Sequence, residues 1–186
     1  KLNYSVAELR LIILYMPLLL SIVISILSFG AVANNDSINN AGAINRAISA
    51  CAQQGGGTVR VPAGTYVTGS IYMQSRVTLR LERGAILRGS VRLADYAPLQ
   101  TDIDLSRYES GQGTVNYNSA TDPQWSRALI FGVGIHHAGI EGPGHIDGAD
   151  VRNPLGEEHM RGPHTILLAG CSDMRFTDFS ITRSAH

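Results

Sequence analysis

The chain has 186 residues, and its 15 basic residues balance its 15 acidic residues, so the formal net charge is zero. A phosphate-binding surface usually shows as a basic excess, so this balance argues against a nucleic-acid partner. Apolar residues make up 44% of the chain and charged residues only 16%, which excludes intrinsic disorder. Together with 20 glycines, these values favour a turn-rich β protein over a helical one.

The chain begins with an apolar segment. Leu11–Ile26 is almost entirely apolar, and the basic residues Lys1 and Arg10 precede it. This charge order is typical of an export signal. Counted on to Ala33, the segment is just long enough to span a bilayer, but Pro17 and several serines interrupt it. We therefore favour a signal peptide over a membrane-spanning helix.

These features divide the chain into a leader, residues 1–21, and a mature domain, residues 22–186. The small residues at 31–33 resemble a cleavage site, but residues 24–31 fit the mature fold better, which favours cleavage near Ser21. The expected protein is exported, secreted or periplasmic, with no stable membrane span once the leader is removed.

One amphipathic helix is predicted over Ala41–Gln53. Its apolar residues recur at i, i+4 and i+7, and they are Ile44, Ile48 and Cys51, with Ala47 on the same face. Asn39 or Asn40 can cap its start, and the glycines at 55–57 end it.

After this helix the apolar period changes to two, which predicts a series of short strands. The predicted strands cover 58–61, 66–73, 77–81, 85–87, 128–131, the neighbourhoods of 140 and 146, 165–168, 174–176 and 179–182. Residues 138–142 resemble 174–178 at an offset of 36 (174 − 138). A repeat of strand, short turn and strand is typical of a coil of a parallel β-helix, and it favours a solenoid over a sandwich or a doubly wound sheet.

Two polar segments, 95–127 and 151–162, show no sustained period. Irregular segments of this length in a compact domain are usually functional or mobile, and these two can border a substrate groove. Within the first we select Arg107 and Tyr108 as candidate substrate-binding residues, although tyrosines are also common in loops that bind nothing.

Other motifs have simpler structural interpretations. Gly132-Val133-Gly134 lacks the third glycine of a dinucleotide-binding turn, because His137 stands there, so no cofactor is expected. The spacing of Glu157, Glu158, His159 and His164 matches no metal motif, and we expect no metal site.

His136-His137 is interpreted as a turn pair, and Asp147 and Asp150 as turn residues, although the two carboxyl groups could act as acid and base. Cys51 and Cys171 could form a disulfide in an exported chain, but we favour two small buried apolar residues.

Several stretches follow one another in an informative order. They are Phe29-Gly30-Ala31, Ala43-Ile44 through Ala50-Cys51, Gly55 through Tyr66, Gly69-Ser70-Ile71, Leu79 through Glu82, Gly84 through Leu87, Asp95-Tyr96, Ala128-Leu129-Ile130, and Gly142-Pro143-Gly144-His145-Ile146-Asp147-Gly148. In this order they resemble the N-terminal portion of the polygalacturonase-like enzymes, glycoside hydrolase family 28, which have a pectin-lyase-like β-helix.

The resemblance implies an all-β, right-handed parallel β-helix with Ala41–Gln53 as a helix that caps its N-terminal end. It also implies that Ile24–Phe29 is a strand of the mature domain. Enzymes of this family hydrolyse α-linked galacturonan with inversion, using one carboxylic acid and one carboxylate base. The implied partner is therefore a pectic polysaccharide or an oligogalacturonide.

The family's Asp-Asp pair, Gly-His-Gly motif and Arg-x-Lys motif are absent from the sequence. No catalytic residue is therefore assigned, and we expect a fold truncated before its C-terminal coils, with the catalytic coils beyond His186. Expressed alone, the chain is expected to be inactive and to associate through its uncovered end. One alternative is a non-catalytic β-helix that binds carbohydrate or attaches to a surface. A further alternative is a β-elimination lyase with the same fold. Such a lyase would need a calcium site built from several carboxylates, and Asp102 and Asp104 alone are too few to support one.

Overall fold

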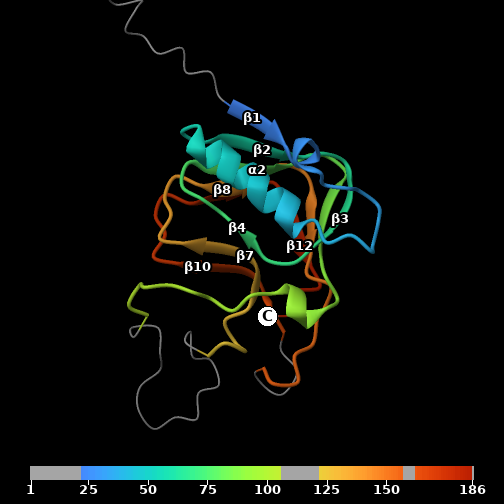
Figure 1. Cartoon of the computed structure of the whole chain (residues 1–186), viewed down its shortest axis with the longest axis vertical. Coiled ribbons are helices and arrows are strands. Elements are labelled where there is room, and N and C mark those ends of the chain that lie inside the picture. Colours follow the sequence, from blue (N-terminus) through green and yellow to red (C-terminus); the bar gives the residue numbers. More distant parts are fainter. Residues whose placement is uncertain (1–21, 106–121, 157–161, 186) are drawn as a thin grey trace, which may run out of the picture.

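The computed structural model describes residues 22–105, 122–156 and 162–185 (Figure 1). Short strands, nearly all separated by brief turns, dominate it, and α2, Ala41–Gln53, is the α-helix of these ranges. Two single-turn 3₁₀ helices accompany it, η1 (Ile26–Phe29) and η2 (Leu93–Asp95).

The strands form three sheets in which every pair of named strands is parallel. Sheet A contains, in spatial order, β1 (Ile22–Ser25), β2 (Gly57–Val61), β5 (Val77–Leu81), β8 (Gly139–Glu141) and β11 (Arg175–Thr177). Sheet B contains β12 (Ser180–Thr182), β9 (His145–Asp147), β6 (Ala85–Gly89) and β3 (Gly64–Thr68). Sheet C contains β10 (His164–Ala169), β7 (Ala128–Val133) and β4 (Ile71–Tyr72).

From β2 to β10 the chain visits sheets A, B and C in turn, so that each of these three coils adds one strand to each sheet, and β11 and β12 begin a fourth coil. This is the right-handed parallel β-helix that the sequence predicted. Phe176 pairs with Ile140, 36 positions earlier, so the predicted repeat is also confirmed. Inward-facing residues of successive coils stack into columns, and Val59, Leu79 and Ile140 form such a column with no exposed surface.

The corners of the coil differ in length. Between sheets A and B the chain needs only residues 62–63, 82–84, 142–144 and 178–179. Between sheets B and C it takes residues 69–70 in the first coil, but 90–127 and 148–163 in the next two. From β2 on, the two longest connections between successive strands therefore both fall between sheets B and C.

The predicted helix is confirmed with the same bounds. α2 lies across the N-terminal end of the coils, against η1, β1, β2, β4 and β5 (Figure 1). Ile44, Ile48 and Cys51 face the core with no exposed surface. Without this cover, the apolar end of the first coil would face water.

The two candidate capping asparagines have separate roles. Asn39 Oδ1 accepts hydrogen bonds from Ala41 N and Gly69 N, both at 3.0 Å. Asn40 is buried, and its amide donates to the carbonyls of Val32 and Val67 while accepting from Val32 N at 2.7 Å. Asn40 thus ties the loop before the helix to strand β3.

Two strand predictions were wrong in extent. Residues 24–29 are not one strand, because β1 ends at Ser25, whose hydroxyl accepts from Leu27 N and starts η1. The predicted strand at 66–73 is divided at Gly69, where a Cβ would lie 2.1 Å from the carbonyl oxygen of Asp95. The chain turns there from sheet B to sheet C.

Both cysteines are free, and the expected burial is confirmed for Cys51 only. Cys51 is fully buried, whereas Cys171 is only partly buried and its thiol donates to the Gly132 carbonyl at 3.2 Å. Burial raises the pKa of the Cys51 thiol. Among the described residues, no helix is long and apolar enough to cross a membrane. The predicted leader, residues 1–21, lies outside the described residues.

Candidate functional site

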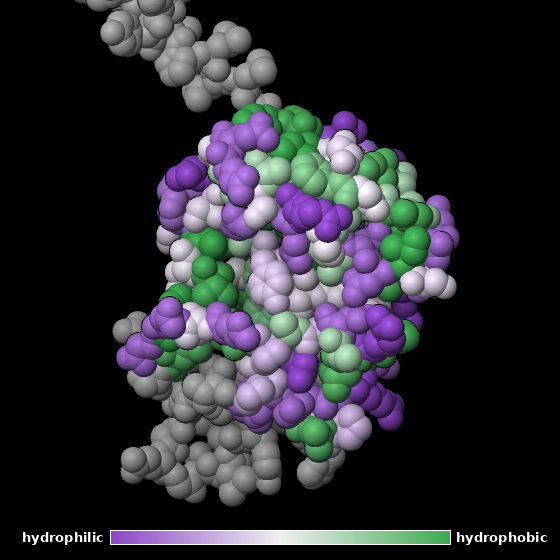
Figure 2. Space-filling view, viewed as in Figure 1, coloured by the Kyte–Doolittle hydropathy of each residue, from purple (hydrophilic) through white to green (hydrophobic). Residues whose placement is uncertain are grey.

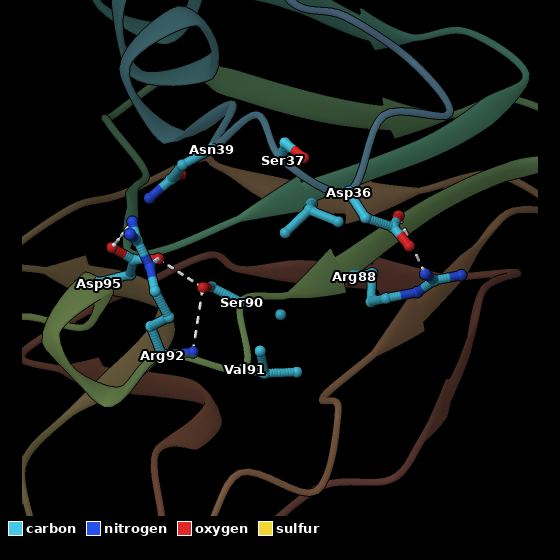
Figure 3. Close-up of a pocket in the computed structure, with 10 residues that line it drawn as sticks. Asp36, Ser37, Asn39, Arg88, Ser90, Val91, Arg92 and Asp95 are labelled. Atoms are coloured by element: carbon cyan, nitrogen blue, oxygen red, sulfur yellow. Dashed lines mark hydrogen bonds and ion pairs between the residues drawn. The ribbon is translucent and has the colours of Figure 1, made fainter.

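A pocket of about 320 Å³ with charged and apolar lining residues lies between the loop that precedes α2 and the end of strand β6 (Figure 3). Its lining includes four charged residues and two valines, which are Asp36, Arg88, Arg92, Asp95, Val67 and Val91. Pockets that bind small molecules span roughly 300–1,000 Å³, so this one has room for a small ligand.

Arg88 reaches the pocket because of strand alternation. Its neighbour Leu87 points inward and is fully buried, so Arg88 points out of sheet B. The Arg88 Nε atom lies 3.5 Å from Asp147 Oδ2 in the next coil, and Nη1 lies 3.3 Å from Asp36 Oδ1. The guanidinium is therefore placed between two carboxylates.

Those two carboxylates are held differently. The Asp147 side chain is only 10% exposed, and it also pairs with Arg183 of the following coil. The Asp36 side chain is 76% exposed and sits on the loop before α2, with Arg88 as the partner described for it. Arg88 thus forms an ion pair without a hydrogen bond to the buried Asp147, and a hydrogen-bonded ion pair to the exposed Asp36 on the side that faces the pocket (Figure 3).

The opposite wall of the pocket is a closed network around Asp95. Arg92 donates to its two carboxylate oxygens, from Nε at 3.1 Å and from Nη2 at 2.8 Å, and the Ser90 hydroxyl donates as well. Burial acts to raise the pKa of Asp95, but the bonds from Arg92 and Ser90 and the charge of Arg92 outweigh it and hold that pKa below its ordinary value. Asp95 is therefore ionised, and both of its carboxylate oxygens accept hydrogen bonds.

The pocket also has an apolar surface. Val67 lies on strand β3 beside Arg88, and Val91 is 78% exposed at the rim. Ser37 and Asn39 supply further polar atoms from the loop side. An apolar patch beside several fixed polar groups is the usual composition of a small-molecule site.

Asp147 and Asp150 are structural, as we had interpreted them. Asp147 Oδ1 accepts from Ala149 N at 3.0 Å, which is turn chemistry. Burial acts to raise the pKa of Asp147, but bonds from Arg183 and Ala149 and the charges of Arg183 and Arg88 lower it on balance. Asp150 has a left-handed backbone, with φ of +50°, in the same turn.

A second feature is aromatic and lies on the outer face of sheet C. Tyr72 of β4 stacks on Phe131 of β7 with ring centroids 5.4 Å apart and planes 9° from parallel. Figure 2 shows apolar and hydrophilic residues mixed on this side of the molecule. Apolar residues gather on its left, at the height at which Figure 1 shows strands β7 and β10. Tyr72 is 44% exposed, so one face of this stack is open to a ligand.

The residues selected from the sequence are spread over the molecule. Arg107 and Tyr108 lie outside the described residues, so their substrate-binding role stays a prediction. Glu157, Glu158 and His159 also lie outside them, whereas His164 is buried and packs edge-on against Trp125. Within the described ranges, no group of three or more His, Cys, Asp or Glu side chains is arranged to hold a metal ion.

Two further motifs are parts of turns. Gly134 has a φ of +61° where β7 leaves sheet C, and a short strand follows it, not a helix, which confirms the interpretation of a turn glycine. His136 and His137 are exposed in the same turn, with their Nδ1 atoms 3.0 Å apart.

The sequence reasoning missed the pocket. Of the ion pairs between different coils in this region, the one of Asp147 with Arg183 had a signal in the sequence, because the two residues are 36 positions apart, the predicted repeat. Asp36 and Arg88 are 52 positions apart and follow no repeat.

No family model matches the chain. Over 137 residues it is 34% identical to an exo-poly-alpha-D-galacturonosidase of Dickeya chrysanthemi, an alignment that covers 72% of this chain and 22% of that protein. A family 28 exopolygalacturonase of Yersinia enterocolitica superposes with a TM-score of 0.65 at 22% identity, over 89% of this chain and 35% of the other. The chain belongs to the polygalacturonase-like family, glycoside hydrolase family 28.

A second relative of this polygalacturonase-like chain is a Vitis vinifera protein named "Probable polygalacturonase", 28% identical over 170 residues. That alignment covers 86% of this chain and 32% of the plant protein. The polygalacturonase-like chain therefore spans only about a fifth to a third of the length of these two relatives.

Proposed function

We propose that the whole protein hydrolyses the α-linked galacturonan of pectin with inversion of configuration. The observation that carries this proposal is the 34% identity over 137 residues to the Dickeya exo-poly-alpha-D-galacturonosidase. Inversion requires a protonated carboxylic acid on one side of the scissile bond and a carboxylate that activates water on the other, about 6.5–9.5 Å apart.

The carboxylates around the pocket do not suit this chemistry. A general acid needs a raised pKa so that it keeps its proton near neutral pH. The pKa values of Asp95 and Asp147 are lowered instead, and both groups are bound to arginines. We therefore give no residue of this chain a catalytic role, and we propose that the 186 residues alone are inactive.

The test uses the whole protein and polygalacturonate as substrate. Released reducing ends are measured, and the anomer that forms first is identified by proton NMR; inversion of an α-linkage gives the β-anomer. The matched control is the 186-residue chain, which is expected to release no reducing sugar above a blank. An α-anomer as first product would overturn inversion, and a whole protein that binds the polymer without cleaving it would support the non-catalytic alternative.

We further propose that the protein is exported and that residues 1–21 are the leader that directs it. The basic residues before an apolar segment support this. A reporter fused behind residues 1–21 is expected outside the cytoplasm, and the same fusion with Leu18, Leu19 and Leu20 changed to Asp is expected to stay inside. Equal distribution of the two fusions would overturn the proposal.

A further inference from the structure

The pocket beside Arg88 has one loosely held charge. Its second arginine, Arg92, is already bonded to Asp95 through two nitrogens. Arg88 instead meets Asp36 through a single contact of 3.3 Å, and the Asp36 side chain is 76% exposed on a loop. An incoming anion can therefore replace Asp36 at Arg88 more easily than it can replace Asp95 at Arg92.

Arg88 would keep its position during such an exchange. Its inner nitrogen, Nε, is buried and has no hydrogen-bond partner among the described residues, but it forms an ion pair with Asp147 Oδ2 at 3.5 Å, and Asp147 is itself bonded to Arg183. A guanidinium held on one side presents its remaining N–H groups to an incoming carboxylate in a fixed geometry, which favours binding.

The charges around the pocket also favour exchange over simple addition. Among the residues that line it, two arginines, Arg88 and Arg92, face two carboxylates, Asp36 and Asp95. Behind Arg88, the charge of Asp147 is balanced by Arg183. A ligand carboxylate that is only added leaves one negative charge in excess. A ligand carboxylate that displaces Asp36 into water preserves the balance at Arg88.

The rest of the pocket fits a sugar ring. Val67 and the exposed Val91 offer an apolar surface for the C–H groups of the ring, and Ser37 and Asn39 offer polar atoms for its hydroxyls. A volume of about 320 Å³ is at the small end for ligand pockets, which suits one residue of a saccharide and not a long segment.

We propose that this pocket binds a single uronate residue of an acidic saccharide, whose carboxylate takes the place of Asp36 at Arg88. The choice of a uronate rests on the proposed function, that the whole protein acts on galacturonan. The pocket serves binding and not cleavage, since its carboxylates are bonded to arginines.

The experiment measures the dissociation constant of the full chain for trigalacturonate by calorimetry, with neutral galactotriose as the uncharged comparison. Arg88→Ala and Val91→Glu are each expected to weaken trigalacturonate binding about tenfold, the loss of one charge-assisted contact or the addition of one repulsive charge. Asp36→Asn is expected to tighten it about threefold, because the competing carboxylate is removed. Galactotriose is expected to bind at least about tenfold more weakly than trigalacturonate.

Matched variants separate the pocket from general charge effects. Glu141→Gln removes a carboxylate that pairs with Arg80 at the same 3.3 Å but in sheet A, and it is expected to leave binding unchanged. Val91→Gln controls for the size of Val91→Glu. Since Val91 is 78% exposed, neither change should disturb folding, so loss of binding in Val91→Glu does not depend on the stability of Arg88→Ala.

The inference is overturned if Val91→Glu binds trigalacturonate like the unchanged chain, if Asp36→Asn binds no more tightly, or if Glu141→Gln has the same effect as Asp36→Asn. Absence of trigalacturonate binding, or equal affinity for galactotriose, also overturns it. None of these results touches the proposed function, which depends on cleavage of polygalacturonate by the whole protein.

Discussion

The inner coils of the β-helix and its last described coil contain the same kind of residue in the same columns, but burial differs sharply. In sheet A, Leu79 and Ile140 have no exposed surface, whereas Phe176 in the next position of their column is 38% exposed. In sheet B, Ile146 is fully buried and its partner Ile181 is 42% exposed.

The difference shows where the stability of this fold comes from. An inward-facing side chain is covered on two sides by the coils before and after it, so its burial is a property of its neighbours. At the other end of the column β1 and α2 supply the cover: Val59 of β2 pairs with Ile24 of β1, β2 also packs against α2, and Val59 is fully buried. Each of the following predictions tests this contrast, from the largest expected effect to the smallest.

The strongest test compares Ile140→Ala with Phe176→Ala. The first change opens a cavity between two coils and is expected to lower the free energy of unfolding by about 2–5 kcal/mol. The second removes a larger but partly exposed side chain and is expected to cost about 1 kcal/mol. Urea denaturation measures both. Equal losses would contradict the view that neighbouring coils supply the burial.

At the capped end, Asn40→Ala is expected to lower the free energy of unfolding by about 1–3 kcal/mol, because it removes the side-chain partner of both the N–H and the carbonyl of Val32 and one of the two donors to the Val67 carbonyl. The control is Asn35→Ala, which removes one bond to Ser37 N at an exposed site and is expected to cost less than about 1 kcal/mol. Thermal unfolding of the two variants decides between them. A larger loss for Asn35→Ala would contradict the role given to Asn40.

The ion pair of Asp147 with Arg183 joins the last coil to the one before it, and its effect depends on pH. The folded pKa of Asp147 lies below its ordinary value of 3.8. Its contribution to stability is therefore present above that value and is lost as the pH falls through the folded pKa. Unfolding free energy measured from pH 6 downward is expected to fall less steeply below about pH 4 in Asp147→Asn than in the unchanged chain. Parallel curves would rule this out.

The smallest effect is expected from ion pairs on the outer surface of the inner coils. The Arg80 side chain is 54% exposed and reaches Glu141 of the next coil at 3.3 Å. Exposed pairs of this kind contribute about 0–1 kcal/mol, so Arg80→Ala should leave the urea midpoint almost unchanged. A loss as large as that of Ile140→Ala would mean that outer ion pairs, and not inner columns, hold the coils together.

Much of the fold was predictable because its signals are local or periodic. Ala41–Gln53 carries its own apolar period and its own stop at the glycines, and the 36-residue repeat relates β8 to β11 directly. The expected association of the chain through its exposed end stays a prediction, for which sedimentation is the measurement.

The pocket was not predictable from the same signals. Arg80 pairs with Glu141 over 61 positions and Asp36 with Arg88 over 52, so no single period connects contacting residues. The 3₁₀ turn after β1 was missed for a related reason, since Ile26 and Leu27 are as apolar as strand residues and only a Ser25 hydroxyl contact ends the strand.

The corner between sheets B and C has a practical consequence. Because residues 90–127 and 148–163 separate β6 from β7 and β9 from β10 in the sequence, while β6 still pairs with β9 and β7 with β10 in parallel, this corner accepts differences in length that the A-to-B corner does not show. Loop closure costs rise only slowly with length. Foreign peptides or whole binding modules could therefore be grafted at this corner, while the stacked strands act as an unchanged scaffold beneath them.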